Sequence, residues 1–496
     1  MRRVRTASGA TAVQIASKYR GVRTIVEHIG SAHTDAELAA LVEVAKTKIQ
    51  AGQQAFDLDA LLPAPVTAAP VVAGSRARVL WEVLEQAYAD VGFDAIGSDT
   101  FTQLVLARVI EPTSKADTIR VLSELGLRSP SLRTIWRTLK RSVTDDWRAA
   151  AAKAAYAHAT AAGPLTVVLY DVTTLYFEAE NEDALRKVGM SKERRVDPQI
   201  LVGLLVDPGG FPLEVHEFEG NKAETRTILP VLDAFRERHQ VDELVVVADA
   251  GMLSAANLKS VQGAGHRFIV GSRTSSAPFD LAEHYDKVGN VFTDGQCVET
   301  TRTMGAGKDA RERRVVWQYR FSRYKRDNIT LNKQIERAEQ IANKTRPARR
   351  DRFVTIDGTT VGVNWAQVEK ARTWLGLKGY VTNIPTEVLD GPGVVAAYHS
   401  LFQVEASFRM AKSDLHARPM CHHEKDSITA HLTIVFCALA IARHLQERTG
   451  FSIKRIIRAL RPLRDVTIIV QGHPITAPTP PEGDAQAILH ALKSGH

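Results

Sequence analysis

Short apolar runs bounded by turn residues predict a buried β-sheet in the middle of the chain. Residues 165–171 form such a run, which ends in the carboxylate of Asp171. Successive residues of a strand face opposite sides of the sheet, and up to Asp171 the residues of this run are apolar or β-branched on both sides. The run therefore fits a strand buried on both faces. Residues 199–206 and 211–218 are similar runs joined by a Pro-Gly-Gly turn, which is typical of a β-hairpin. Together the three runs predict an antiparallel meander.

Two further strands and two helices follow the meander. They are expected at residues 223–239 (helix), 243–249 (strand), 253–262 (helix) and 266–271 (strand). The order strand-strand-strand-helix-strand-helix-strand is that of the ribonuclease H fold, so the predicted class is α/β, a mixed sheet flanked by helices. In that sheet the strands that end in Asp171 and Asp249 would be parallel neighbours. Both carboxylates are therefore expected at one edge.

The preceding part of the chain has apolar residues at helical spacing. Five helices are expected, at residues 78–91, 98–109, 115–125, 131–143 and 145–160. The fourth begins at Ser131 after a short Ser/Pro turn and places Arg133, Arg137 and Lys140 on one face. This is the outline of a helix-turn-helix with a basic second helix, a DNA-binding motif. A solvated basic face on an ordinary helical bundle is the alternative interpretation.

Shifts in composition divide the chain into six expected regions. Thr34 and Glu37 form a predicted capping box at the start of a helix over residues 34–51, and an Ala/Pro-rich stretch at 62–70 is typical of a linker. The regions are a small N-terminal α+β region (1–60), a helical region (75–160), the first part of the core (161–271), a largely β insertion (272–385), the second part of the core (386–450) and a C-terminal tail (451–496).

Positive charge is concentrated in the insertion. Residues 301–352 contain 16 Lys and Arg against 6 Asp and Glu, a local balance of +10 compared with +8 for the whole chain. Trp317, Tyr319, Phe321 and Tyr324 interleave with these cations. Cations bind phosphates and aromatic rings stack on bases, so the pattern favours a DNA-facing surface over one that only confers solubility.

Cysteine usage and the absence of targeting signals indicate the compartment. The three cysteines lie far apart and form no CxxC pair, which favours a reducing cytosol and argues against a zinc site. The N-terminus lacks the apolar segment of a signal peptide. The longest apolar run, residues 432–442, is too short to span a bilayer. A cytoplasmic, nucleoid-associated protein is expected.

A third acid lies on a long helix predicted at Gly393–Lys412. The residues that recur at intervals of three and four, and so share one face, are Tyr398, Leu401, Glu405, Phe408 and Lys412. The face is otherwise apolar, and burying a carboxylate there is costly unless a cation compensates it. Two Asp and one Glu that converge offer the oxygen ligands that Mg²⁺ prefers and would support two-metal phosphoryl transfer. Each acid alone is more often a cap, a turn residue or a solvated side chain; their combination favours a catalytic site.

Several motifs resemble those of the DDE-class insertion-sequence transposases, specifically the IS4-like group and its IS1634 relatives. The segments that carry the likeness are 167–176, Gly189 to Lys192 with Arg195 and Asp197, Gly220-Asn221, 247–253, and Tyr398, Glu405 and Lys412 with Arg418-Pro419. The resemblance covers about residues 75–450. It implies a ribonuclease H-like catalytic domain interrupted by an insertion between the second Asp and the Glu.

The resemblance also implies roles for individual residues. Asp171, Asp249 and Glu405 would be the metal-binding catalytic triad, with two Mg²⁺ ions for which Mn²⁺ can substitute. In the helix signature of the family an Arg stands where this chain has Leu401, and Arg409 is expected to take over part of its role. Tyr398, Arg409 and Lys412 would contact DNA, with Asn221 and Lys192 as further possible contacts.

The implied function is transposition. The protein would bind the terminal inverted repeats of its element, hydrolyse a strand at each end with a metal-activated water, and join the freed 3′-hydroxyl to target DNA. Pairing two ends implies a homodimer on DNA. One alternative is a catalytically inactive or domesticated DNA-binding protein of the same fold. Another, a phosphatase of the haloacid dehalogenase type, requires an Asp-x-Asp motif, and the chain has Thr173 at the second position.

Overall fold

The computed structural model describes two compact units, residues 159–408 and residues 1–158 with 409–496. The second unit combines segments that the sequence assigned to the N-terminal, helical and tail regions with residues 409–450, which it assigned to the second part of the core. The expected linker and the motif residues Met190 to Arg195, Met252, Leu253, Pro419 and Cys421 lie outside the described residues. Those described are 1–6, 9–19, 22–50, 71–178, 181–189, 197–251, 255–305, 307, 310–347, 351–357, 360–418, 420, 422, 424–470 and 473–494.

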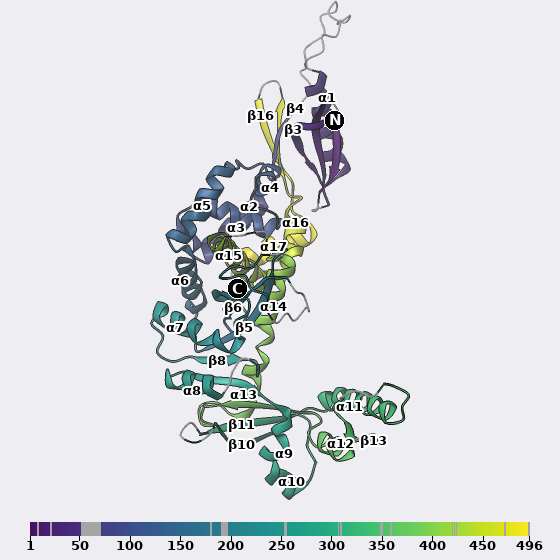
Figure 1. Ribbon diagram of the computed structural model, residues 1–496. Coiled ribbons are helices and arrows are strands. Elements are labelled where there is room, and N and C mark those ends of the chain that lie inside the picture. Colours follow the sequence, from purple (N-terminus) through teal and green to yellow (C-terminus); the bar gives the residue numbers. More distant parts are fainter. Residues whose placement is uncertain are drawn as a thin grey trace, which may run out of the picture. The chain divides into compact units, whose positions relative to one another are not determined.

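An eight-stranded sheet with the order β10-β11-β14-β9-β8-β5-β6-β7 forms the centre of the 159–408 unit (Figure 1). Its strands are β5 (Val167–Tyr176), β6 (Gln199–Val206), β7 (Pro212–Glu219), β8 (Val245–Ala248), β9 (Arg267–Ser272), β10 (Cys297–Met304), β11 (Arg311–Tyr319) and β14 (Leu377–Thr382). β5, β6 and β7 are antiparallel, whereas β8 and β9 run parallel to β5. The predicted meander and the parallel pairing of the two Asp-bearing strands are confirmed. The helices α7 (Ile228–His239) and α8 (Ala255–Gly263) connect the strands as predicted.

The first strand does not end at Asp171, as the sequence pattern predicted. β5 continues to Tyr176, and its second half pairs with β6 from Asp171 opposite Leu204 to Tyr176 opposite Gln199. The added residues are mainly β-branched or aromatic, which favours a strand. The neighbouring strand β8 does end at Ala248, so Asp171 lies in mid-strand at the level where its parallel neighbour stops.

Part of the insertion belongs to the central sheet. β14 pairs with β9, β11 with β14, and β10 with β11, all antiparallel. Another part forms a small hydrophobic cluster around α11 (Phe321–Ala342), α12 (Trp365–Arg372) and the hairpin β12 (Val354–Asp357) to β13 (Thr360–Val363). Since α11 alone has 22 residues, the prediction of a largely β insertion is wrong.

The helix predicted at Gly393–Lys412 is also interrupted. The structure has α13 (Gly391–His399), α14 (Phe402–Arg409) and a π-helical turn, Met410–Asp414. At the break, the amide of Ser400 donates to the carbonyls of both Ala396 and Ala397, and that of Leu401 donates to Tyr398. Because of the break, Leu401 and Glu405 do not share the predicted face. Leu401 is buried, with 7% of its surface exposed, whereas Glu405 is exposed to solvent and is not directed into a core.

The unit of residues 1–158 and 409–496 contains the five predicted helices. They are α2 (Arg78–Asp90), α3 (Asp99–Ile110), α4 (Thr118–Glu124), α5 (Leu132–Thr144) and α6 (Trp147–Thr160). Their central partner is α15 (Lys425–Thr449), which packs against α3 and α5. By length and composition α15 could cross a membrane, but 89% of its most apolar window is buried in the protein, as in a core helix.

Two small sheets complete this unit. β1 (Arg2–Arg5), β2 (Thr11–Tyr19) and β3 (Val22–Ala32) pack on α1 (Asp35–Gln50), whose capping box is confirmed by the bond from the amide of Glu37 to Oγ1 of Thr34. β16 (His473–Pro478), β15 (Asp465–Val470) and β4 (Val71–Arg76) form the other sheet. The prolines in residues 474–481 predict a break between elements, but residues 474–478 belong to β16, which lies at an edge, where proline is tolerated. The helices α16 (Ile453–Leu460) and α17 (Gly483–Lys493) flank these tail strands in sequence.

Candidate active site

Asp171 and Asp249 occupy equivalent positions on neighbouring strands. Leu169 on β5 pairs with Val247 on β8 in parallel register, and the two aspartates follow two residues later on each segment. Adjacent strands are about 4.8 Å apart. Asp249 is exposed just beyond the end of β8, and Asp171 is half-buried. Two carboxylates are thus presented together at the level where β8 ends, and α/β sheets carry their ligands at the carboxyl ends of parallel strands.

Tyr398 joins this pair from α13. Its hydroxyl donates a hydrogen bond of 3.0 Å to Oδ1 of Asp249. Burial raises the pKa of Tyr398 above its usual range, and the negative charges of Asp249 and, to a smaller extent, Glu405 act in the same direction. Gly271 on β9 leaves room for the ring, because a Cβ at that position would lie 2.9 Å from the hydroxyl. Tyr398 was predicted as a DNA contact; its bond to Asp249 depends on the packing of α13 against β8 and β9 and has no signal in the sequence.

The structure brings two of the three predicted acids together and leaves the third apart. Glu405 lies in the first turn of α14, exposed, and is close enough to influence Tyr398 electrostatically. Among the residues that the structure describes, no three Asp, Glu, His or Cys side chains are arranged to hold one metal ion. The carboxylates of Asp171 and Asp249 match the preference of hard divalent cations for oxygen ligands.

The predicted basic helix is confirmed as α5, with its cations exposed. Ser131 caps it by accepting a bond from the amide of Thr134. Ile135 and Leu139 are buried, whereas Arg133, Arg137 and Lys140 are exposed on the opposite side. Trp136 is 48% exposed among them and was not predicted as a site residue, although it stands three positions after Arg133.

The other predicted DNA contacts differ in exposure. Arg409 is exposed at the end of α14, and Lys412 is half-buried in the π-helical turn. Leu401, at the position where the family has Arg, is buried and contributes to packing. Asn221 is exposed beside Gly220, whose backbone packs so closely that a Cβ would lie 2.0 Å from the carbonyl oxygen of Gln199.

Some of the charged and aromatic residues of the insertion have structural roles. Trp317 is fully buried and donates from its ring nitrogen to Asp280, so it cannot stack on a base. Arg314 pairs with Glu299 at 2.8 Å. Phe321, by contrast, is 49% exposed at the start of α11. The insertion therefore has fewer cations and rings available for a ligand than the sequence count suggested.

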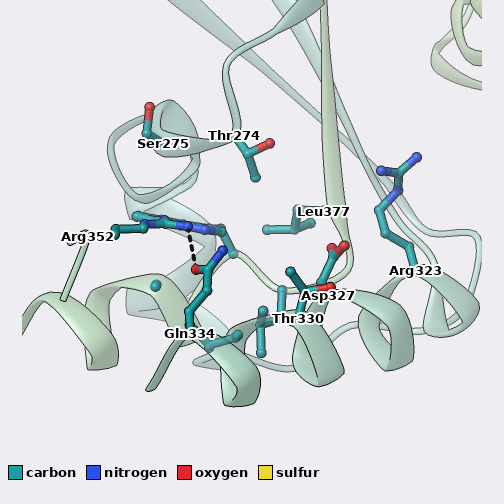
Figure 2. Close-up of a pocket in the computed structure, with 12 residues that line it drawn as sticks. Thr274, Ser275, Arg323, Asp327, Thr330, Gln334, Arg352 and Leu377 are labelled. Carbon is teal, nitrogen blue, oxygen red and sulfur yellow. Dashed lines mark hydrogen bonds between the residues drawn. The ribbon is translucent and has the colours of Figure 1, made fainter. Parts of the chain in front are cut away.

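A polar cavity of about 280 Å³ lies between α11, α12 and the start of β14 (Figure 2). Arg352 donates to Gln334 at 3.4 Å on one side of it. Asp327 and Arg323 project from α11, and Figure 2 shows the Arg323 guanidinium directed away from the Gln334–Arg352 pair. None of the three predicted catalytic acids lines this cavity.

Comparison with known proteins identifies the class. Residues 162–441 match the family described as "Transposase DDE domain". The match covers more than half of the chain, and it includes Asp171, Asp249 and Glu405. The protein belongs to this family of DDE transposases.

No curated protein matches the chain significantly. Among solved structures, it is similar to a piggyBac transposase synaptic complex with hairpin DNA, with 10% sequence identity and a TM-score of 0.35, over 78% of this chain and 69% of that chain.

Proposed function

We propose that the protein is the transposase of an insertion sequence of the IS4-like group and its IS1634 relatives. It binds the terminal inverted repeats of its element and catalyses Mg²⁺-dependent strand cleavage and strand transfer through Asp171, Asp249 and Glu405. The observation that carries the proposal is the placement of Asp171 on β5 next to Asp249, which directly follows β8, inside the segment that matches the family.

The residues at this edge have separable roles in the proposed reaction. Asp171 and Asp249 would hold the metal, with Glu405 as the proposed third ligand. A bound Mg²⁺ supplies Lewis acidity that lowers the pKa of water and stabilises charge on a leaving oxygen. Tyr398 holds the Asp249 carboxylate in one orientation through its hydrogen bond. The proposed partner is DNA, with a homodimer pairing the two element ends.

The test is cleavage of the element's own ends. DNA flanking the gene should contain inverted repeats, and the purified protein with Mg²⁺ should nick a duplex that carries one of them at the junction with flanking DNA. Binding without nicking, in Mg²⁺ and in Mn²⁺, would instead support a catalytically inactive DNA-binding protein. The observation that favours this second function is that Glu405 does not complete a metal cluster with the two aspartates.

Replacing Tyr398 by Phe should weaken metal binding at the proposed site. The hydroxyl orients the Asp249 carboxylate by donating to Oδ1, and a carboxylate oxygen can accept this bond and bind a metal at the same time. Removing such a supporting hydrogen bond should raise the Mn²⁺ dissociation constant by roughly tenfold, measured by electron paramagnetic resonance. Tyr285→Phe is the control, because the Tyr285 hydroxyl donates to the Thr373 carbonyl in the insertion. Unchanged or tighter binding by the Tyr398 variant would contradict the orienting role.

Removing the positive charges of α5 should weaken binding to DNA of any sequence. Each of Arg133→Gln, Arg137→Gln and Lys140→Gln that removes a phosphate contact should reduce the slope of log affinity against log salt by about 0.9. Fluorescence anisotropy with a labelled duplex at several salt concentrations measures both quantities. Lys153→Gln on α6 is a matched control, since Lys153 is also exposed in this unit. If the three variants behave like Lys153→Gln, α5 is only a solvated face.

A further inference from the structure

Lys378 lies beside the candidate active site, on β14, which contains none of the motifs that resemble the family. Its Nζ is 5.4 Å from the centre of the Tyr398 ring. Tyr380, two residues further along β14, also contacts Tyr398, with 4.8 Å between ring centres. Because alternate residues of a strand face the same side, Lys378 and Tyr380 both lie on the side of the sheet that α13 covers. Lys378 is therefore linked to Asp249 through a single side chain, Tyr398.

Arg323 on α11 acts electrostatically on Lys378, and Arg320, just before α11, acts on His399 together with both of them. Burial lowers the pKa of Lys378, and the charge of Arg323 lowers it further, whereas Asp249 raises it. The pKa of His399 is lowered by burial and by all three cations, Arg323, Arg320 and Lys378. His399 itself contacts the Tyr380 hydroxyl at 3.4 Å. All three cations act on His399, which follows Tyr398 in α13, and we call them the Lys378 cluster.

The protein neutralises this cluster only in part. Arg320 pairs with Asp294 at 3.8 Å, whereas within the described part of the chain neither Lys378 nor Arg323 forms an ion pair. Like charges held together without counter-charges are unfavourable, so an arrangement of this kind favours an anion. The nearest acid that acts on Lys378, Asp249, is engaged by Tyr398.

We propose that the Lys378 cluster is a phosphate-binding site for the DNA backbone, adjoining the Asp249 edge. The inference rests on the proposed function. A guanidinium can contact two phosphate oxygens at once, and the Lys ammonium acts as a point charge. A strand of DNA, rather than a small anion, fits the continuation of the cluster along α11, where Lys325 stacks on the exposed ring of Phe321 at 4.6 Å. Lys378 is then a positioning residue, which fixes the backbone beside the carboxylates.

The experiment compares DNA binding and DNA cleavage in the full chain. Dissociation constants for a fluorescein-labelled duplex are measured at several salt concentrations for Lys378→Gln and Arg323→Gln, because phosphate contacts do not depend on sequence. Each variant should bind about tenfold more weakly, with a salt slope smaller by about one. Lys378→Arg should restore binding, since it keeps the charge.

Two comparisons keep this inference separate from the proposed function. Lys287→Gln removes one exposed charge elsewhere in the insertion, where Lys287 pairs with Glu283 at 2.6 Å, and should bind like the wild type. If Lys378→Gln binds normally, or if Lys287→Gln weakens binding as much, the phosphate site is refuted. The Asp249→Asn variant tests the proposed function instead: it should bind DNA but not cleave it. Normal cleavage by Asp249→Asn would refute the proposed chemistry, whatever the binding of the Lys378 variants.

Discussion

Replacing Asp249 by Asn should abolish DNA strand cleavage, with a loss of about 10³-fold or more. A metal-bound carboxylate contributes several kcal/mol to stabilising the charge of the transition state, and each 1.4 kcal/mol changes the rate tenfold. Asn keeps the size of the side chain, and its oxygen can still accept the bond that Tyr398 donates to Oδ1. Cleavage of an end-bearing duplex under single-turnover conditions measures the loss. The fold and the DNA affinity should be preserved.

The control for this variant is at the opposite end of the same strand. Asp242 is exposed in the turn before β8, so Asp242→Asn removes an equal charge away from the candidate site. Asp249→Cys provides a second check, because a thiolate prefers softer metals than Mg²⁺. Its residual activity should be higher in Mn²⁺ than in Mg²⁺. Equal cleavage by Asp249→Asn and Asp242→Asn would show that Asp249 has no role in the chemistry.

Replacing Arg461 by Met should destabilise the unit of residues 1–158 and 409–496 by about 3–5 kcal/mol. Arg461 is buried, and its Nη2 contacts Glu111 at 2.9 Å and Glu124 at 3.4 Å. Arg120 also contacts both carboxylates, at 2.6 and 2.7 Å. Without Arg461, two buried carboxylates share one partly exposed guanidinium, and unpaired buried charge is costly. Urea unfolding followed by circular dichroism measures the change, with the exposed Arg458→Met as control.

The effect of Arg461→Met should depend on pH. Burial alone would raise the pKa of Glu111, but the hydrogen bond from Arg120 and the charge of Arg461 lower it below its usual value. A carboxyl group whose pKa is lower in the folded protein stabilises the fold at pH values above its pKa in the unfolded chain, about 4.3. This stabilisation is lost as the pH falls through the pKa of the folded state. The difference in the free energy of unfolding between wild type and variant should therefore be largest near pH 7 and should become smaller below about pH 4. If this difference does not change with pH, the variant loses stability through packing and not through charge.

The element order was predictable because each strand and helix has its own local pattern. Apolar runs between turn residues predicted β5 to β9, and the capping box at Thr34 predicted the start of α1. Local patterns did not predict elements whose extent depends on the strands with which they pair. β5 continues past Asp171 because β6 pairs with its second half, and β16 forms across prolines because it needs only one neighbour. The break at Ser400 has no Gly or Pro to signal it.

The sequence by itself determined the strand order around Asp171 and Asp249, the basic face of α5 and the resemblance to DDE transposases. These depend on local periodicity and on residue types at fixed spacings. The tertiary structure alone decided what surrounds the two aspartates. Tyr398 reaches Asp249, and Lys378 reaches Tyr398, because β14 and α13 return to the sheet more than 100 residues after β8. It also decided that Glu405 is exposed on a separate helix, since a helix break rotates every later side chain to a new face.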